Sequence, residues 1–193
     1  MKYIDYYTSP LGNITIASDG QSIIGLWFDG QKYDRQILEG EEVEKKSLPV
    51  FSQTKTWLDV YFSGREPDFT PPLSILGSAF QKLVDEIMVQ IPYGKTMSYG
   101  EIAKEIEYRF PEKTVSAQAV GGAVGHNNIS LIVPCHRVIG ADGSLTGYAG
   151  GIDKKEKLLQ IEKNGRPAKK ASAGDACYRW QSQCTETRSN RRS

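Results

Sequence analysis

The chain has 193 residues, 39% hydrophobic and 24% charged, which is enough for one sizeable globular domain or two small ones. No stretch approaches the roughly 18 consecutive apolar residues of a membrane span, and the first residues lack the apolar core of a signal peptide. We therefore expect a cytoplasmic protein with no membrane association. The net charge is +1, and the basic excess lies after residue 165, so composition alone does not indicate that the main body binds nucleic acid.

The cysteines indicate free thiols. There are three, Cys135, Cys177 and Cys184, with no C-x-x-C pair and only two histidines in the whole chain. Sparse, unpaired cysteines are typical of the reducing cytosol. A structural zinc site needs about four Cys or His ligands close together, so we expect no metal.

The N-terminal part is predicted to be a small antiparallel sheet. Three short β-rich runs, separated by turn sequences, predict strands at 3–8, 14–18 and 23–28. Residues 34–48 are charged and predicted to be helix or loop. A helix is expected at 53–62, where aromatic and aliphatic residues recur at helical spacing. Three prolines between 66 and 72 indicate a linker, so the first domain is predicted to span residues 1–72.

Residues 73–165 are predicted to be mainly helical. Apolar residues from Phe80 to Ile91 follow a helical period. Ser98 and Glu101 match a capping box that opens the next helix. Ser116 can cap a third helix of uncharged Ala and Gly residues. Glycine disfavours helix by about 1 kcal/mol relative to alanine, so its adjacent glycines indicate close approach of either a packed helix or a ligand.

A last helix is predicted to begin with Asp153 as its cap and to end at Gly165. Apolar periodicity is lost from Arg166 onward, and residues 166–193 are predicted to be a basic, disordered tail.

The sequence around Cys135 suggests reactivity. The apolar, β-branched run from Ile129 predicts a buried strand that Pro134 ends. Cys135, His136 and Arg137 follow at once. A thiol with its usual pKa near 8.5 is mostly protonated at neutral pH, and an adjacent histidine, directly or through water, can accept the proton. A third group must orient that histidine, and Glu162 is a candidate. An inert buried cysteine remains the alternative.

The residues Ile132–Val138 resemble the I/V-P-C-H-R-V signature of methylated-DNA–protein-cysteine methyltransferases, the O6-alkylguanine-DNA alkyltransferases. Four further segments resemble that family in the same order, at 80–84, 91–103, 119–128 and 147–159. The resemblance implies an α+β protein with a ribonuclease-H-like N-terminal domain and a helical C-terminal domain containing a helix-turn-helix and an active-site strand. It implies single-turnover transfer of an alkyl group from O6-alkylguanine, and from O4-alkylthymine, without a cofactor.

The resemblance also implies roles for individual residues. Cys135 would accept the alkyl group, His136 would act through a bound water as its base, and Glu162 would orient His136. Tyr99 would press on a phosphate and help protonate the leaving guanine, and Asn127 would join the recognition helix to the active-site strand. The other implied positions are DNA contacts at Ser116, Gln118, Ala119, Gly121, Gly122 and Arg137, and a base pocket at Val138, Tyr148, Ala149, Gly150 and Gly151.

The helix-turn-helix would comprise 98–109 and 116–127, with the second helix in the minor groove of alkylated double-stranded DNA. We expect a monomer that flips the target base into its pocket.

The chain departs from the family pattern at two positions that affect these expectations. Gln118 stands where many members carry an arginine, which predicts weaker or differently salt-dependent DNA binding. Asp85 stands where an aromatic residue is common, and we expect it to be exposed. The zinc-binding cysteines of some members are also missing.

Two other functions are weighed against alkyl transfer. Alkyltransferase-like binding modules flag lesions but replace the acceptor cysteine, so Cys135 favours transfer. A cysteine hydrolase would use Cys135 and His136 directly, which is awkward if both lie on one strand, because adjacent strand residues face opposite sides.

Overall fold

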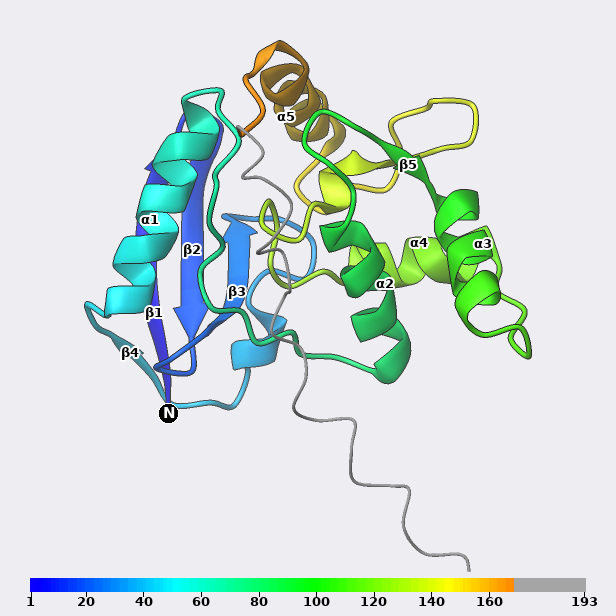
Figure 1. Ribbon diagram of the computed structural model, residues 1–193. Helices are drawn as coiled ribbons and strands as arrows, with labels where there is room; N and C mark the ends of the chain where they lie inside the picture. The colour runs from blue at the N-terminus through cyan, green and yellow to red at the C-terminus, as the bar shows by residue number, and fades with distance from the viewer. Residues whose placement is uncertain (169–193) are drawn as a thin grey trace, which may run out of the picture.

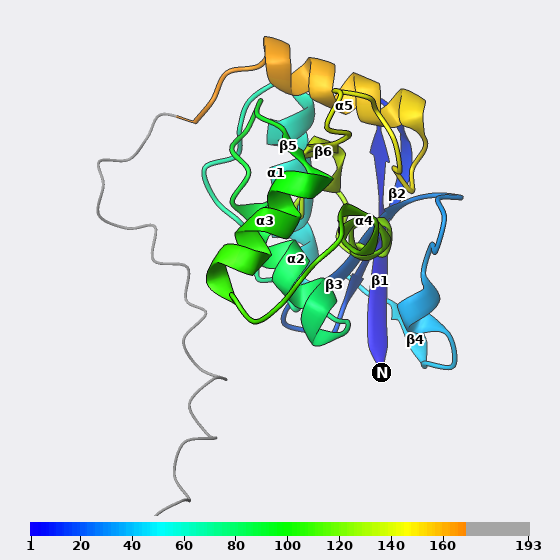
Figure 2. The ribbon, with the colours of Figure 1, turned by 90° about the vertical axis from the view of Figure 1, so that its right-hand side faces the viewer.

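The computed structural model describes residues 1–168 as a sheet covered by helices on one face (Figure 1). The strands of the main sheet are β1 (Lys2–Ser9), β2 (Gly12–Ser18), β3 (Ile23–Phe28) and β4 (Val43–Lys45), in the order β3-β2-β1-β4. The helices are α1 (Pro49–Phe62), α2 (Ala79–Val89), α3 (Tyr99–Arg109), α4 (Ala117–Gly125) and α5 (Ile152–Asn164). Figure 2 shows α5 crossing one end of the molecule, above the helical part and the sheet.

The three predicted strands are confirmed, but the sheet is mixed. β1 pairs antiparallel with β2, and β2 with β3, whereas β4 pairs parallel with β1. The prediction of a purely antiparallel sheet is therefore wrong. β4 is three exposed residues, Val43 to Lys45, in a charged segment. A short edge strand of this kind needs few apolar residues, so it left no periodic pattern to detect.

Local capping signals set the helix starts in the second half. The Ser98 hydroxyl accepts a hydrogen bond from the Glu101 amide at 3.2 Å, and the Glu101 carboxylate accepts one from the Ser98 amide at 2.7 Å. This confirms the predicted capping box of α3. Ser116 likewise caps α4 by accepting from the Ala119 amide at 3.1 Å. The expected cap at Asp153 is wrong, because Gly151 occupies that position with φ +94° and α5 begins at Ile152.

One apolar core joins the sheet to the helices. It contains Ile14 and Phe28 from the sheet, Leu58 from α1, Val84 from α2 and Cys135. A smaller apolar cluster lies on the opposite face of the sheet and consists of Ala17, Ile24, Trp27 and Leu38. Because the main core draws on both halves of the chain, burial there stabilises both together. Within residues 1–168, no helix is long and apolar enough to cross a membrane.

The predicted buried strand before Cys135 is wrong. Residues Ser130 to Val133 form a buried turn, in which Leu131 has φ +71°, and Cys135–Arg137 form a 3-10 helix. Within residues 1–168, the strand that follows Cys135–Arg137 is β6 (Val138–Ile139), which pairs in parallel with β5 (Met97–Ser98). A short apolar run shows that a segment is buried but not what conformation it takes.

The first tail residues are ordered. The Arg166 amide donates to the Gly64 carbonyl at 2.9 Å, and the Arg166 carbonyl accepts from the Glu66 amide at 2.9 Å. Disorder was predicted from this residue onward, so the prediction is wrong at its start. The rest of the tail, including Cys177 and Cys184, lies outside the described residues.

Candidate active site

Cys135 is the first residue of the 3-10 helix and is only 4% exposed. Burial raises the pKa of its thiol to about 11, with the nearby charge of Asp85 adding to this and Asn127 and Lys155 opposing it. The thiol is therefore protonated at neutral pH in the DNA-free protein. Nucleophilic chemistry at this sulfur requires a base that takes the proton.

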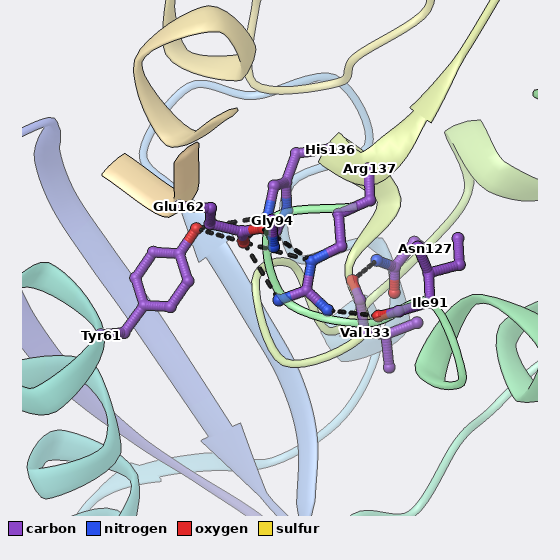
Figure 3. Close-up of polar contacts among 8 residues, drawn as sticks. All are labelled: Tyr61, Ile91, Gly94, Asn127, Val133, His136, Arg137 and Glu162. Atoms are coloured by element: carbon purple, nitrogen blue, oxygen red, sulfur yellow. Dashed lines mark hydrogen bonds and ion pairs between the residues drawn. The ribbon is translucent and has the colours of Figure 1, made fainter. Parts of the chain in front are cut away.

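Asn127 fixes the turn that carries Cys135. Its side-chain amide donates to the Val133 carbonyl at 2.8 Å (Figure 3). Its side-chain carbonyl accepts from the Ile129 amide at 2.9 Å. Asn127 lies two residues after Gly125, the last residue of α4. One buried side chain thus connects the segment that follows α4 to the turn that carries Cys135.

His136 and Glu162 form a buried pair. The His136 Nε2 lies 2.6 Å from Glu162 Oε1, and the Tyr61 hydroxyl donates to the same oxygen at 2.9 Å (Figure 3). Because an ionised carboxylate only accepts, we assign the histidine proton to Nε2. Burial lowers the pKa of His136 despite Glu162, so the ring is neutral at neutral pH. Its Nδ1 has no protein partner within residues 1–168 and keeps a lone pair.

Glu162 is held as a carboxylate by Arg137. The arginine Nε donates to Oε2 at 2.9 Å and its Nη2 to Oε1 at 3.0 Å, while Nη1 donates to the Ile91 carbonyl. The Gly94 amide adds a bond to Oε2 at 3.0 Å. Burial raises the pKa of Glu162, but His136 and Arg137 outweigh it and lower the pKa to about 2. The expected phosphate contact of Arg137 is wrong for this structure, because its buried guanidinium is already paired.

Lys155 and Tyr99 hold the loop between β6 and α5. The Lys155 ammonium donates to the carbonyls of Val138 and Thr146, each at 2.6 Å. The Tyr99 hydroxyl donates to the same Thr146 carbonyl at 2.8 Å. Burial lowers the pKa of Lys155 to about 8, with Cys135 opposing the shift. The lysine therefore places a buried positive charge near the thiol.

The residues expected to line a base pocket differ in how far they are buried. Val138 and Tyr148 are buried, Ala149 and Gly150 are half-buried, and Gly151 is exposed. A Cβ at Gly150 would come within 2.7 Å of the Tyr148 ring, so glycine is required there. The loop thus packs its backbone directly on Tyr148.

The residues expected to touch DNA share one surface of α4. Ser116, Gln118, Ala119 and Gly122 are exposed, and Gly121 is half-buried. A Cβ at Gly121 would only touch the Tyr99 ring, at 3.8 Å, and one at Gly122 would meet nothing within 4 Å. Close packing against a neighbouring helix therefore does not explain these glycines. They leave a smooth, uncharged surface that another molecule can approach closely.

Three residues of the site have no signal in the sequence that identifies them. Tyr61 has the helical spacing of an ordinary core aromatic, and Lys155 stands in a run of charges typical of a solvated surface. Asp85 was expected to be exposed, and this is wrong: it is 4% exposed and faces the core from α2. Within residues 1–168 no group of three or more His, Cys, Asp or Glu side chains could hold a metal ion.

Both parts of the chain match known families. Residues 2–75 match the family described as 6-O-methylguanine DNA methyltransferase, ribonuclease-like domain. Residues 79–164 match the 6-O-methylguanine DNA methyltransferase, DNA binding domain.

Similar proteins cover most of the chain. A methylated-DNA–protein-cysteine methyltransferase of Haemophilus influenzae is 40% identical over 162 residues, 83% of this chain and 86% of the relative. A methylated-DNA–protein-cysteine methyltransferase of Mycobacterium bovis is 43% identical over 161 residues, which are 83% of this chain and 92% of the relative.

A solved structure is also similar to this chain over most of its length. The structure of Mycobacterium tuberculosis OGT in complex with DNA is 41% identical to this chain, with a TM-score of 0.74. The match covers 86% of this chain and 96% of the OGT chain. The buried cysteine with its His-Glu pair, both family matches and these relatives together show that this chain belongs to the 6-O-methylguanine DNA methyltransferase family.

Proposed function

We propose that this protein repairs O6-alkylguanine in double-stranded DNA by transferring the alkyl group to Cys135, and that each molecule acts once. The observation that carries the proposal is the buried Cys135 beside a neutral His136, whose proton is held on the Glu162 side. That arrangement leaves the Nδ1 lone pair of His136 to accept the thiol proton. A binding module would need no such base.

The reaction is an in-line displacement at the alkyl carbon. His136 Nδ1 takes the Cys135 proton through a bound water, and the thiolate attacks the carbon on O6. A C–S bond forms as the C–O bond breaks, and guanine leaves with the bonding electron pair. Burial raises the pKa of Tyr99, which keeps its hydroxyl protonated and able to donate a proton toward the leaving base. The thioether is stable, and the step needs no cofactor or metal.

DNA would bind along the exposed surface of α4, in the minor groove. A target base in the duplex cannot reach a buried thiol, so it must be flipped out, at a cost of a few kcal/mol. Gln118 lies at the start of α4, where it can occupy the gap that the flipped base leaves in the duplex. Tyr99 presses on the neighbouring phosphate, and the Tyr148 to Gly151 loop holds the flipped base. The same pocket would accept O4-alkylthymine, and the protein would act as a cytoplasmic monomer.

Intact mass tests the transfer. The protein is mixed with a duplex oligonucleotide that contains O6-methylguanine, and its mass is measured before and after. We expect a gain of one methylene on the peptide that contains Cys135, and none in Cys135→Ser, which should still bind the duplex. Lesion binding by the wild type without any mass gain would favour a binding module instead.

Restoring an arginine at position 118 should tighten DNA binding. Gln118 is exposed at the first turn of α4, where an arginine would add a charge and a planar group that stacks. We expect Gln118→Arg to bind lesion DNA about tenfold more tightly at low salt and to show a steeper salt dependence. The measurement is a binding titration at two salt concentrations.

The matched control for this substitution is Gln160→Arg. It adds the same charge on the exposed surface of α5, away from the proposed DNA-binding helix. An equal gain in both variants would show that net charge, and not position 118, sets the affinity.

A further inference from the structure

The helix α4 is weak by its own sequence, so contacts from elsewhere must keep it ordered. It has nine residues, and three of them are glycine: Gly121, Gly122 and Gly125. Each glycine disfavours helix relative to alanine, and a helix this short is marginal in water on its own. The contacts that hold its last turn therefore matter for how well the helix is ordered.

His126 caps the last turn of α4 with its side chain. The ring Nδ1 lies 2.7 Å from the Gly122 carbonyl oxygen, one turn earlier. Because a carbonyl oxygen only accepts, we assign a proton to Nδ1. The His126 amide also donates to the Ala123 carbonyl at 3.1 Å. Each bond satisfies one of the last carbonyl groups, which a helix by itself leaves without partners.

Tyr33 holds the His126 ring from the other half of the chain. The two rings are stacked, with their centroids 4.2 Å apart and an angle of 19° between their planes. Tyr33 lies in the part that matches the ribonuclease-like domain, residues 2–75, and His126 lies in the part that matches the DNA binding domain, residues 79–164. The stack therefore joins the two parts at the end of α4.

The loop that carries Tyr33 is anchored independently of its ring. The side-chain carbonyl of the buried Gln31 accepts from the Phe28 amide at 3.0 Å. The Lys32 amide donates to the Ala149 carbonyl at 3.1 Å. Tyr33 follows with φ +63°, a conformation that is uncommon for a residue other than glycine. Because these bonds use the backbone on either side of the loop, they fix the place of the ring and should remain when the ring is removed.

We propose that Tyr33 is a positioning residue for DNA binding: by stacking on His126, it holds the last turn of α4 in the conformation in which the helix meets DNA. Gly122, whose carbonyl His126 caps, is exposed and belongs to the surface of α4 expected to contact DNA. A helix that is ordered before DNA arrives loses less conformational entropy on binding. The inference rests on the proposed function, because it takes α4 as the helix that binds DNA.

Hydrogen exchange in Tyr33→Ala tests the contact without DNA. The amides of His126 and Asn127 donate to the carbonyls of Ala123 and Val124 at the end of α4, and their exchange is followed by NMR. We expect them to exchange about three- to tenfold faster in Tyr33→Ala than in the wild type, the factor that corresponds to the usual contribution of an aromatic pair. Tyr33→Phe keeps the ring and should exchange like the wild type.

The matched control is Tyr6→Ala, on β1. The Lys45 ammonium lies 5.2 Å from the centre of the exposed Tyr6 ring, much as that of Lys32 lies 4.8 Å from the centre of the Tyr33 ring. Tyr6→Ala should leave the exchange at the end of α4 unchanged. Unchanged exchange in Tyr33→Ala, or an equal increase in Tyr6→Ala, would overturn the proposal. If Tyr33→Ala does not fold, Tyr33→Leu, which keeps apolar volume without a flat ring, is measured in its place.

The dependence of methyl transfer on duplex concentration tests the role in DNA binding. In Tyr33→Ala we expect the half-saturating concentration of the O6-methylguanine duplex to rise about three- to tenfold, with the maximal rate unchanged. A smaller folded fraction would reduce the yield without moving the half-saturating concentration. A lower maximal rate at an unchanged half-saturating concentration would contradict the proposal.

A double-mutant cycle tests whether Tyr33 acts through His126. In a His126→Ala protein the stacking partner is gone, so adding Tyr33→Ala should weaken binding of the duplex no further. An equal loss of affinity on adding Tyr33→Ala, with and without His126, would show that the stack has no part in it.

The inference and the proposed function can fail separately. If the wild type binds the O6-methylguanine duplex but gains no mass, the proposed function is wrong, and a binding titration of Tyr33→Ala against the wild type still decides the role of Tyr33. If the wild type transfers the methyl group and Tyr33→Ala binds the duplex as tightly as the wild type, only the inference about Tyr33 is wrong.

Discussion

Glu162→Gln is expected to destabilise the folded protein by about 3–5 kcal/mol at neutral pH, because it leaves a buried arginine without its anion. The carboxylate accepts bonds from Arg137, His136, Tyr61 and the Gly94 amide. A neutral amide can replace only part of these. Denaturant unfolding at neutral pH measures the loss.

The effect of Glu162→Gln should depend on pH in a defined direction. The pKa of Glu162 is lowered from 4.5 to about 2 in the folded state. Its contribution is therefore fully present above the unfolded pKa of 4.5 and is lost as the pH falls toward 2. The difference in stability between wild type and variant should shrink over that interval. A difference that stays constant down to about pH 2 would contradict the ionised pair.

The control for this substitution is Glu156→Gln, on the same helix. Glu156 is exposed and accepts a long hydrogen bond from the Gln160 side-chain amide at 3.4 Å, so we expect a change within about 0.5 kcal/mol. Methyl transfer should be lost in Glu162→Gln and kept in Glu156→Gln. Conditions in which both variants are folded, verified by circular dichroism, separate the catalytic loss from the loss of stability.

Lys155→Met is expected to slow methyl transfer by about tenfold or more, since one unit of thiol pKa is a factor of ten in thiolate. The lysine charge lowers the pKa of Cys135, and its ammonium holds the carbonyls of Val138 and Thr146. Methionine keeps the length and apolar stem and removes both effects. The defect should be greatest below the Lys155 pKa of about 8, where the wild-type lysine is charged.

The measurement is the single-turnover rate of methyl transfer at several pH values, with Lys157→Met as the control. Lys157 lies on the same helix and is exposed, so its loss should change neither rate nor pH dependence. If Lys155→Met reacted at the wild-type rate below pH 8, the lysine charge would have no part in activating Cys135.

The contact between His136 and Glu162 in the candidate site was predicted from the sequence, while the rest of its charge network was not. Cys135, His136 and Glu162 were assigned together, and the His136–Glu162 pair is present in the fold. Arg137 was assigned to phosphate, yet it is buried against Glu162. The sequence around an arginine that lies two residues after a cysteine is the same whether its side chain faces DNA or pairs with a carboxylate 25 positions away.

Local signals predicted many of the helices and strands, because these signals depend on residues within one or two turns of each other. The strand periodicity at 3–28, the Ser98–Glu101 capping box and the Ser116 cap follow from neighbours in the chain, and all are present. Only the tertiary structure showed which segments are buried and which side chains point toward the site. The run after Ile129 is a buried turn, Asp85 is buried against the core, and Tyr61 and Lys155 reach the site from α1 and α5. Burial and charge pairing arise from contacts between distant segments, and for that reason no local pattern could predict them.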